Sequence, residues 1–206
     1  YTDLWVEEFR ESDGVLEYRT EDNWQPAKVE NTTIRIKNEA SQELELVETT
    51  RGYVMHGEPR SGAAIAMRYT ATDQINKQWE CLRPMLWAAN VHELNSSQEL
   101  WEEPVNNLVS GDTSDNISYL FRGRIPIRSD ASGRILPALG SRDGGDWIGD
   151  VPRDELPQAT NPSEGFIATS NQNPWAQQEP FLSHEFAPAS RAERVSEALS
   201  VGNQWE

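Results

Sequence analysis

The chain has 206 residues, a length that suits one large domain or two small ones. Its 34 acidic and 18 basic residues give a net charge of −16, and only three of the bases are lysines. Such a surface repels nucleic acid and anionic membranes, and no run of about 18 apolar residues could form a transmembrane helix. The composition is typical either of a protein from a saline source or of an ordinary acidic protein. The single cysteine, Cys81, excludes an internal disulfide and a zinc site built on cysteines.

The first 70 residues predict a β-rich region. Apolar and polar residues alternate near residues 4–9, 33–37 and 44–48, which is the pattern of half-buried strands. A hairpin loop is expected at 38–42, and a further strand pair at 53–55 and 64–69.

Residues 73–103 predict helices. Apolar residues are spaced by three or four from Trp79 to Ala89, although Pro84 should break or kink a helix there. A second helix is expected from Asn90, and a further short helix is expected to enter at Ser96–Glu99. The indole rings in this region (Trp79, Trp87) are expected in the core, with the wall of a ligand pocket as the alternative.

The remaining elements alternate with irregular chain. A β-hairpin is expected within 105–128, and a long ordered loop with one strand, at 165–169, within 129–171. A last helix is expected at 190–200.

Few side chains stand out as catalytic on pattern alone. The three histidines are far apart, no Gly-x-Ser-x-Gly elbow is present, and the carboxylates cannot be distinguished from the acidic background. Asn107 and Asn171 lie at strand-like ends, where an amide can donate to a developing oxyanion, although most such asparagines close turns.

Five segments resemble passages of the penicillin acylase family, in order and at compatible spacing. These segments are Asp3–Glu7, Phe121–Arg128, Trp147–Pro157, Asn161–Asn171 and Arg191–Val195. Any one of them is a weak signal, but together they cover nearly the whole chain.

The resemblance implies an α+β fold, as part of the four-layer αββα sandwich of N-terminal-nucleophile hydrolases. It implies an amidohydrolase that is made as a precursor, cuts itself in two and exposes a serine whose own α-amine acts as the base. The residue that matches the family's oxyanion-hole asparagine is Asn107, and the residue that matches its active-site arginine is Arg128. The expected substrates are small N-acyl amides, either β-lactam side chains, as in antibiotic metabolism, or N-acyl homoserine lactones, as in quorum quenching.

The whole chain, residues 1–206, is interpreted as an internal fragment of the larger (β) subunit, because the expected serine would lie upstream of Tyr1. A complete small domain is the alternative. The resemblance implies that the rest of the β-subunit and the α-subunit are partners, with no nucleic acid and no membrane insertion. It also implies a periplasmic or secreted location and no cofactor for the chemistry, with no metal site in this segment and structural calcium conceivable in the full protein.

Two alternatives of function stay open at this point. One is a non-catalytic binding or structural module that keeps the scaffold, and the other is an unrelated hydrolase that uses carboxylates. For Arg128 the alternative is an arginine that only ties the following loop to the sheet.

Overall fold

The structure is a computed structural model that describes residues 1–129, 135–142, 146–174 and 181–201. The chain divides into two compact units. Unit 1 comprises Tyr1–Asp73 and Arg128–Asp146, and unit 2 comprises Gln74–Ile127 and Trp147–Glu206. No helix of the described residues is long and apolar enough to cross a membrane.

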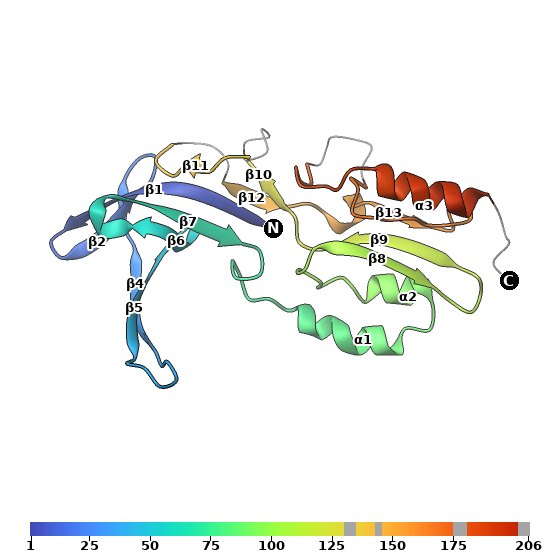
Figure 1. The fold of residues 1–206 in the computed structure, drawn as a ribbon, viewed down its shortest axis with the longest axis horizontal. Helices are drawn as coiled ribbons and strands as arrows, with labels where there is room; N and C mark the ends of the chain where they lie inside the picture. The colour runs from blue at the N-terminus through green and yellow to red at the C-terminus, as the bar shows by residue number, and fades with distance from the viewer. Residues whose placement is uncertain (130–134, 143–145, 175–180, 202–206) are drawn as a thin grey trace. The chain divides into compact units, whose positions relative to one another are not determined.

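Unit 1 is built on one antiparallel sheet with the strand order β3-β2-β1-β7-β6-β5-β4 (Figure 1). Its strands are β1 (Thr2–Ser12), β2 (Val15–Arg19), β3 (Trp24–Pro26), β4 (Lys28–Ile34), β5 (Gln42–Thr49), β6 (Gly52–Glu58) and β7 (Ala63–Tyr69). A 3₁₀ turn, η1 (Pro59–Ser61), connects the last two strands. Strand β11 (Ala138–Leu139) adds to the sheet by pairing in parallel with β1 at Trp5 and Val6.

The buried face of β1 carries an unusual sequence. Because side chains alternate along a strand, Asp3, Trp5, Glu7 and Phe9 point to one face, and all four are buried. Phe9 joins the hydrophobic core of the unit, which also contains Leu16, Tyr18, Val47 and Ala64. Two carboxylates therefore lie on the inward face of a core strand and need charged or hydrogen-bonding partners.

Strands β4 and β5 form a long hairpin that extends away from the rest of the unit 1 sheet (Figure 1). Only the end of β5 pairs with β6, at Glu48–Tyr53 and Thr49–Gly52. The outer part of the hairpin is consequently exposed on both faces.

Unit 2 centres on a three-stranded sheet with the order β13-β9-β8. Its strands are β8 (Asn106–Gly111), β9 (Ile117–Arg122) and β13 (Gln158–Thr160), and β10 (Pro126–Arg128) pairs separately with β12 (Trp147–Asp150). The helical elements are η2 (Gln78–Cys81), α1 (Leu82–Trp87), α2 (Val91–Ser96), η3 (Arg153–Glu155) and α3 (Ser190–Ser200).

Local sequence explains how the helices begin. Pro84 lies in the first turn of α1, where a missing N–H costs no hydrogen bond, and the preceding turn is 3₁₀. The break predicted at Pro84 is not observed, because α1 continues through Pro84 to Trp87 and the change from η2 to α1 lies before it, between Cys81 and Leu82. Asn90 caps α2, because its side chain accepts a hydrogen bond from the backbone N–H of Glu93 at 2.9 Å.

Several predicted elements need correction. The strand expected at 165–169 is absent from the described residues, and the strand in this part of the chain is β13, eight residues or so earlier. The short helix expected at Ser96–Glu99 is a set of turns that follow α2. The strand expected at 33–37 runs over Lys28–Ile34 instead. Within the expected loop 129–171, residues 130–134 and 143–145 lie outside the described residues.

Candidate functional site

Asn107 lies on β8 and is held through both ends of its amide. Its Oδ1 accepts a hydrogen bond from the hydroxyl of Tyr119 at 2.7 Å. Its Nδ2 donates to Oγ1 of Thr169 at 2.9 Å. An amide nitrogen carries two N–H groups, and the second has no hydrogen-bond partner among the described residues. The side chain is half-buried, so this donor belongs to a partly desolvated group.

The register of the hairpin decides which face this amide occupies. Asn107 pairs with Phe121 and Val109 pairs with Tyr119, and residues directly opposite in an antiparallel pair share a face. The intervening residues, including Ser118, point to the other face. Helix α2 covers that other face, because Asn95 Nδ2 donates to Oγ of Ser118 at 2.7 Å. Figure 1 shows α1 and α2 on one side of β8 and β9, and α3 on the opposite side.

The loop that supplies Thr169 is tied to α3. The guanidinium of Arg191 donates to the backbone oxygen of Ser170 at 2.7 Å. Asn171, the other asparagine singled out in the sequence, has a positive φ of 63° and its backbone oxygen accepts from Ala187 N–H at 2.8 Å. Its Oδ1 also accepts a hydrogen bond from the guanidinium of Arg191 at 3.4 Å, so Asn171 helps to hold this loop in place.

Burial raises the pKa of the Tyr119 phenol well above its ordinary value of 10.0. The ring is half-buried in the sheet beside Ala159 of β13. A raised pKa keeps the phenol protonated, so its O–H remains a donor to Asn107 throughout the neutral and mildly alkaline range.

A cavity of about 570 Å³ lies in the helical layer of unit 2. Its lining includes Trp87 and Leu100 together with the carboxylates of Glu80, Glu93 and Glu99. Because α2 covers the face of the hairpin opposite to Asn107, this cavity does not belong to the surroundings of that amide. The prediction that the two tryptophans lie in the core is wrong, since Trp79 is 72% and Trp87 75% exposed.

Arg128 belongs to unit 1 and forms a bidentate ion pair with Asp3. Its Nε donates to Oδ2 at 2.7 Å and its Nη2 to Oδ1 at 3.2 Å, and both side chains are buried. The ring of Tyr1 lies 5.8 Å from the guanidinium carbon. This contact is the one expected of an arginine that ties the following segment to the sheet. Arg128 lies in unit 1, whereas Asn107 lies in unit 2.

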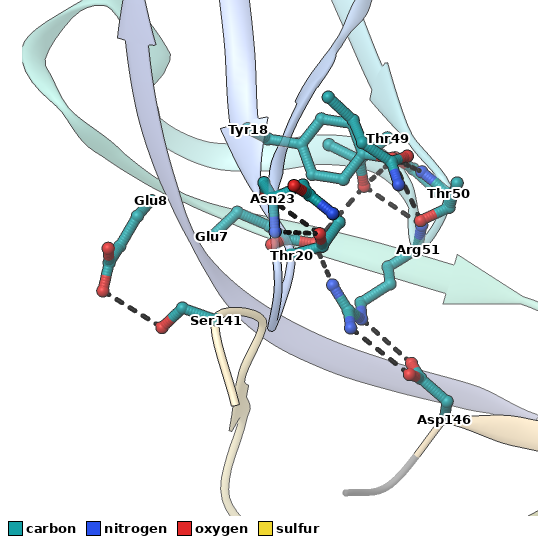
Figure 2. Close-up of polar contacts among 12 residues, drawn as sticks. Glu7, Glu8, Tyr18, Thr20, Asn23, Thr49, Thr50, Arg51, Ser141 and Asp146 are labelled. Carbon is teal, nitrogen blue, oxygen red and sulfur yellow. Dashed lines mark hydrogen bonds and ion pairs between the residues drawn. The ribbon is translucent and has the colours of Figure 1, made fainter. Parts of the chain in front are cut away.

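A second buried ion pair lies further along β1. Figure 2 shows the guanidinium of Arg51 between Glu7 and Asp146. Its Nε and Nη2 donate to the two carboxylate oxygens of Asp146 at 2.9 and 3.3 Å, and its Nη1 lies 3.5 Å from Oε1 of Glu7. Glu7 is fully buried, whereas the side chain of Asp146 is 46% exposed, so the cluster runs from the core to the surface.

The Glu7 carboxylate is incompletely compensated. Its Oε2 is buried and accepts no hydrogen bond from the described residues, while Oε1 accepts one from the hydroxyl of Thr49 at 3.4 Å. Burial raises the pKa of Glu7 above its ordinary value of 4.5, although the charge of Arg51 acts in the opposite direction. Oε2 packs against Gly140, where a Cβ would lie 1.9 Å from it.

Together the two ion pairs fasten one segment to β1. The second segment of unit 1 lies between the two segments of unit 2 in the sequence. It begins at Arg128 and ends at Asp146. Between them, the backbone N–H of Gly140 donates to the oxygen of Val6 at 2.8 Å. The hydroxyl of Ser141 donates to Glu8 at 3.1 Å (Figure 2). These contacts are structural, and the described residues hold no group of three side chains that could bind a metal ion.

The sequence alone did not single out the partners of Asn107. Thr169 lies within a recognised segment, Asn161–Asn171, but its contact spans 62 residues and no local pattern predicts it. Tyr119 could have been found from the hairpin, because the turn fixes the register and the register fixes which residues share the face of Asn107. Asp3 and Glu7 are the first and last residues of another recognised segment, and period-two alternation places both on one face.

Comparison with solved structures shows which fold this chain has. It superposes on a thermostable penicillin G acylase from Alcaligenes faecalis with a TM-score of 0.77, at 19% sequence identity, covering 94% of this chain and 36% of that one. The predicted class, an α+β part of an N-terminal-nucleophile hydrolase fold, is confirmed by this match.

Sequence comparison shows the family. The Penicillin amidase family description matches residues 1–206. The chain is 31% identical over 198 residues to the penicillin acylase 2 proenzyme of Pseudomonas sp. (strain SE83), and 28% identical over 208 residues to the acyl-homoserine lactone acylase QuiP of Pseudomonas fluorescens. These matches include 96% and 98% of this chain, but only 25% of the length of each relative. The chain belongs to the penicillin amidase family.

Proposed function

We propose that the protein containing this chain is an amidohydrolase that cleaves the linear amide bond of small N-acyl compounds. The support is that family membership extends over the entire chain, and that relatives are named as a penicillin acylase and as acyl-homoserine lactone acylases. Because the chain spans about a quarter of the length of these relatives, the rest of the machinery is proposed to come from other parts of the same protein.

The chemistry proposed is acyl transfer to a serine hydroxyl and then to water. The hydroxyl oxygen of an amino-terminal serine, which this chain does not contain, forms a bond to the amide carbonyl carbon. Its proton passes to the serine's own α-amine and then to the departing amine as the C–N bond breaks. Water hydrolyses the resulting ester, which releases the acid and restores the hydroxyl.

Asn107 is proposed to supply a side-chain donor to the tetrahedral oxyanion of both steps. The observation that carries this assignment is the anchored amide, whose oxygen is occupied by Tyr119 and whose second N–H has no partner among the described residues. A preorganised donor of this kind stabilises charge that develops in the transition state, at no cost of reorganisation. The electrostatic role of Arg128 stays a prediction, and its ion pair with Asp3 would hold it in place for that role as well.

The test is Asn107→Ala in the full-length protein, assayed on penicillin G and on N-acyl homoserine lactones by the release of the free amine. We expect kcat to fall by about 10²–10³-fold, which corresponds to the loss of one oxyanion donor. The thermal midpoint should fall only modestly, because the variant leaves the half-buried hydroxyl of Tyr119 without its acceptor but removes no charge. Wild-type turnover in this variant would reject the assignment of Asn107 as the oxyanion donor. No release of amine by the wild-type protein would instead favour a module that keeps the scaffold without the chemistry.

Partners and location are also proposed rather than established. The name of the Pseudomonas SE83 relative describes it as a proenzyme, which supports a processed precursor for this protein too. The partners would then be the remainder of that precursor and a small N-acyl amide. The expected export to the periplasm or beyond stays a prediction, which fractionation of cells that express the full-length protein would test.

A further inference from the structure

We propose that Tyr119 is a positioning residue, which sets the orientation of the Asn107 amide so that an N–H group, and not the carbonyl oxygen, faces the substrate. The inference rests on the proposed function, because it concerns the same candidate oxyanion donor. It adds a residue outside the five recognised segments, since Tyr119 precedes the nearest of them, Phe121–Arg128.

The two ends of an asparagine amide have nearly the same shape, so an amide can rotate unless its neighbours distinguish oxygen from nitrogen. Here the phenolic O–H of Tyr119 donates to Oδ1 at 2.7 Å, and the hydroxyl of Thr169 accepts from Nδ2 at 2.9 Å. A rotated amide would present its N–H to Tyr119 and leave the phenolic proton without an acceptor among the described residues. Leaving a half-buried O–H unsatisfied is unfavourable, so the tyrosine selects the observed orientation.

Both anchors are themselves held by secondary structure. Tyr119 lies in β9, the middle strand of the three-stranded sheet, with Val109 opposite it on β8 and Ala159 on β13. Thr169 lies next to Ser170, whose backbone oxygen is held by Arg191 of α3. A strand and a loop that are distant in the sequence therefore fix the two ends of one amide. Donors held in this way are preorganised, which is what an oxyanion site requires.

The experiment compares Tyr119→Phe with the wild type in the full-length protein, with penicillin G and an N-acyl homoserine lactone as substrates. The ring is kept and only the hydroxyl is lost. We expect kcat to fall about twofold, because without the phenolic donor the two orientations of the amide approach equal populations and about half of the molecules present the wrong end. KM should stay within about twofold, because the donor acts in the transition state and not on the bound substrate.

A double variant separates positioning from general damage. In an Asn107→Ala background the tyrosine has no amide to orient, so adding Tyr119→Phe should lower kcat no further. The matched control is Tyr18→Phe in unit 1, where the phenolic hydroxyl donates to Oε1 of Gln25 at 3.0 Å and lies 3.2 Å from the hydroxyl of Thr50. This variant should lower the thermal midpoint and leave kcat unchanged.

The outcomes distinguish the two proposals. A wild-type kcat in Tyr119→Phe, together with a large loss in Asn107→Ala, would overturn the positioning role and leave the proposed function intact. The positioning role would also be overturned if Tyr119→Phe lowered kcat by the same factor in the wild type and in the Asn107→Ala background, because the tyrosine would then act independently of the amide. Full activity of Asn107→Ala would reject the oxyanion role of Asn107 and the positioning role with it, whereas a wild-type protein that releases no amine from either substrate would reject the proposed function itself.

Discussion

The cluster around Asn107 in unit 2 and the cluster around Glu7 in unit 1 differ in the kind of group that they hold. In unit 2, a neutral amide is held by two neutral hydroxyls, and one of its donors has no partner among the described residues. In unit 1, two buried carboxylates of β1 face two arginines, Arg51 and Arg128. The charged cluster fastens a returning segment to the sheet, whereas the neutral cluster orients a donor. In these two clusters, the buried ion pairs hold the framework together, whereas the candidate oxyanion donor is uncharged.

This difference has a consequence for how the clusters respond to mutation. A charge that loses its partner inside a protein retains its full cost of desolvation, so damage to the unit 1 cluster should appear as lost stability. Damage to a neutral oriented donor should appear as lost turnover with little loss of stability. The following variants, in order of expected effect on stability, test whether the separation holds.

Arg51→Met should have the largest effect. It leaves Glu7 fully buried without its countercharge, and breaking a buried pair in this way typically costs about 3–5 kcal/mol. The measurement is the thermal midpoint of the full-length protein. The matched control is Arg60→Met, because Arg60 pairs with Glu11 and Glu45 at an exposed site, where solvent screening leaves little effect on the thermal midpoint. Equal losses in the two variants would contradict the special role of the buried pair.

Arg128→Lys should have an intermediate effect. Lysine keeps the positive charge but cannot reproduce the two-pronged contact with Asp3, so we expect a loss of about 1–3 kcal/mol of stability. Because the charge is kept, kcat should remain close to that of the wild type. A large fall in kcat without any change in the thermal midpoint would instead show that the guanidinium acts directly on the reacting groups.

Glu7→Gln should have the smallest effect, visible as a dependence on pH. Burial raises the pKa of Glu7 above 4.5, so the folded state holds its proton more tightly than the unfolded state. Its contribution to stability is complete below pH 4.5 and is lost as the pH rises through the raised pKa. The free energy of unfolding of the wild type should therefore decline relative to that of Glu7→Gln over this window, as measured by urea unfolding. A constant difference between the two proteins would show that the carboxyl group is not perturbed.

The sequence predicts most of this fold where local signals are strong. Alternation over 44–48 and 64–69 predicts β5 and β7, and the turn residues at 111–116 predict the β8–β9 hairpin. It fails where tertiary contacts decide. The run 165–169 has the composition of a strand, but no neighbouring strand pairs with it in the described structure, whereas the polar β13 is a strand because β9 lies beside it.

The candidate site shows the same limit. Resemblance identifies Asn107 and Arg128, because motifs are read along the chain. The side chains that hold them, Thr169 and Asp3, are 62 and 125 residues away in sequence, and no periodicity connects such distant positions. Only the contact of Tyr119, twelve residues from Asn107 within one hairpin, follows from local register.

The absence of a side chain at Gly140 also affects which residue can lie at position 7. The carboxyl group at position 7 is fully buried and occupies the space that a methyl group at position 140 would fill. The sizes of the side chains at positions 7 and 140, which are 133 residues apart, therefore depend on each other. A homologous enzyme with alanine at the second position should carry a shorter residue at the first, and the pair should change together in evolution.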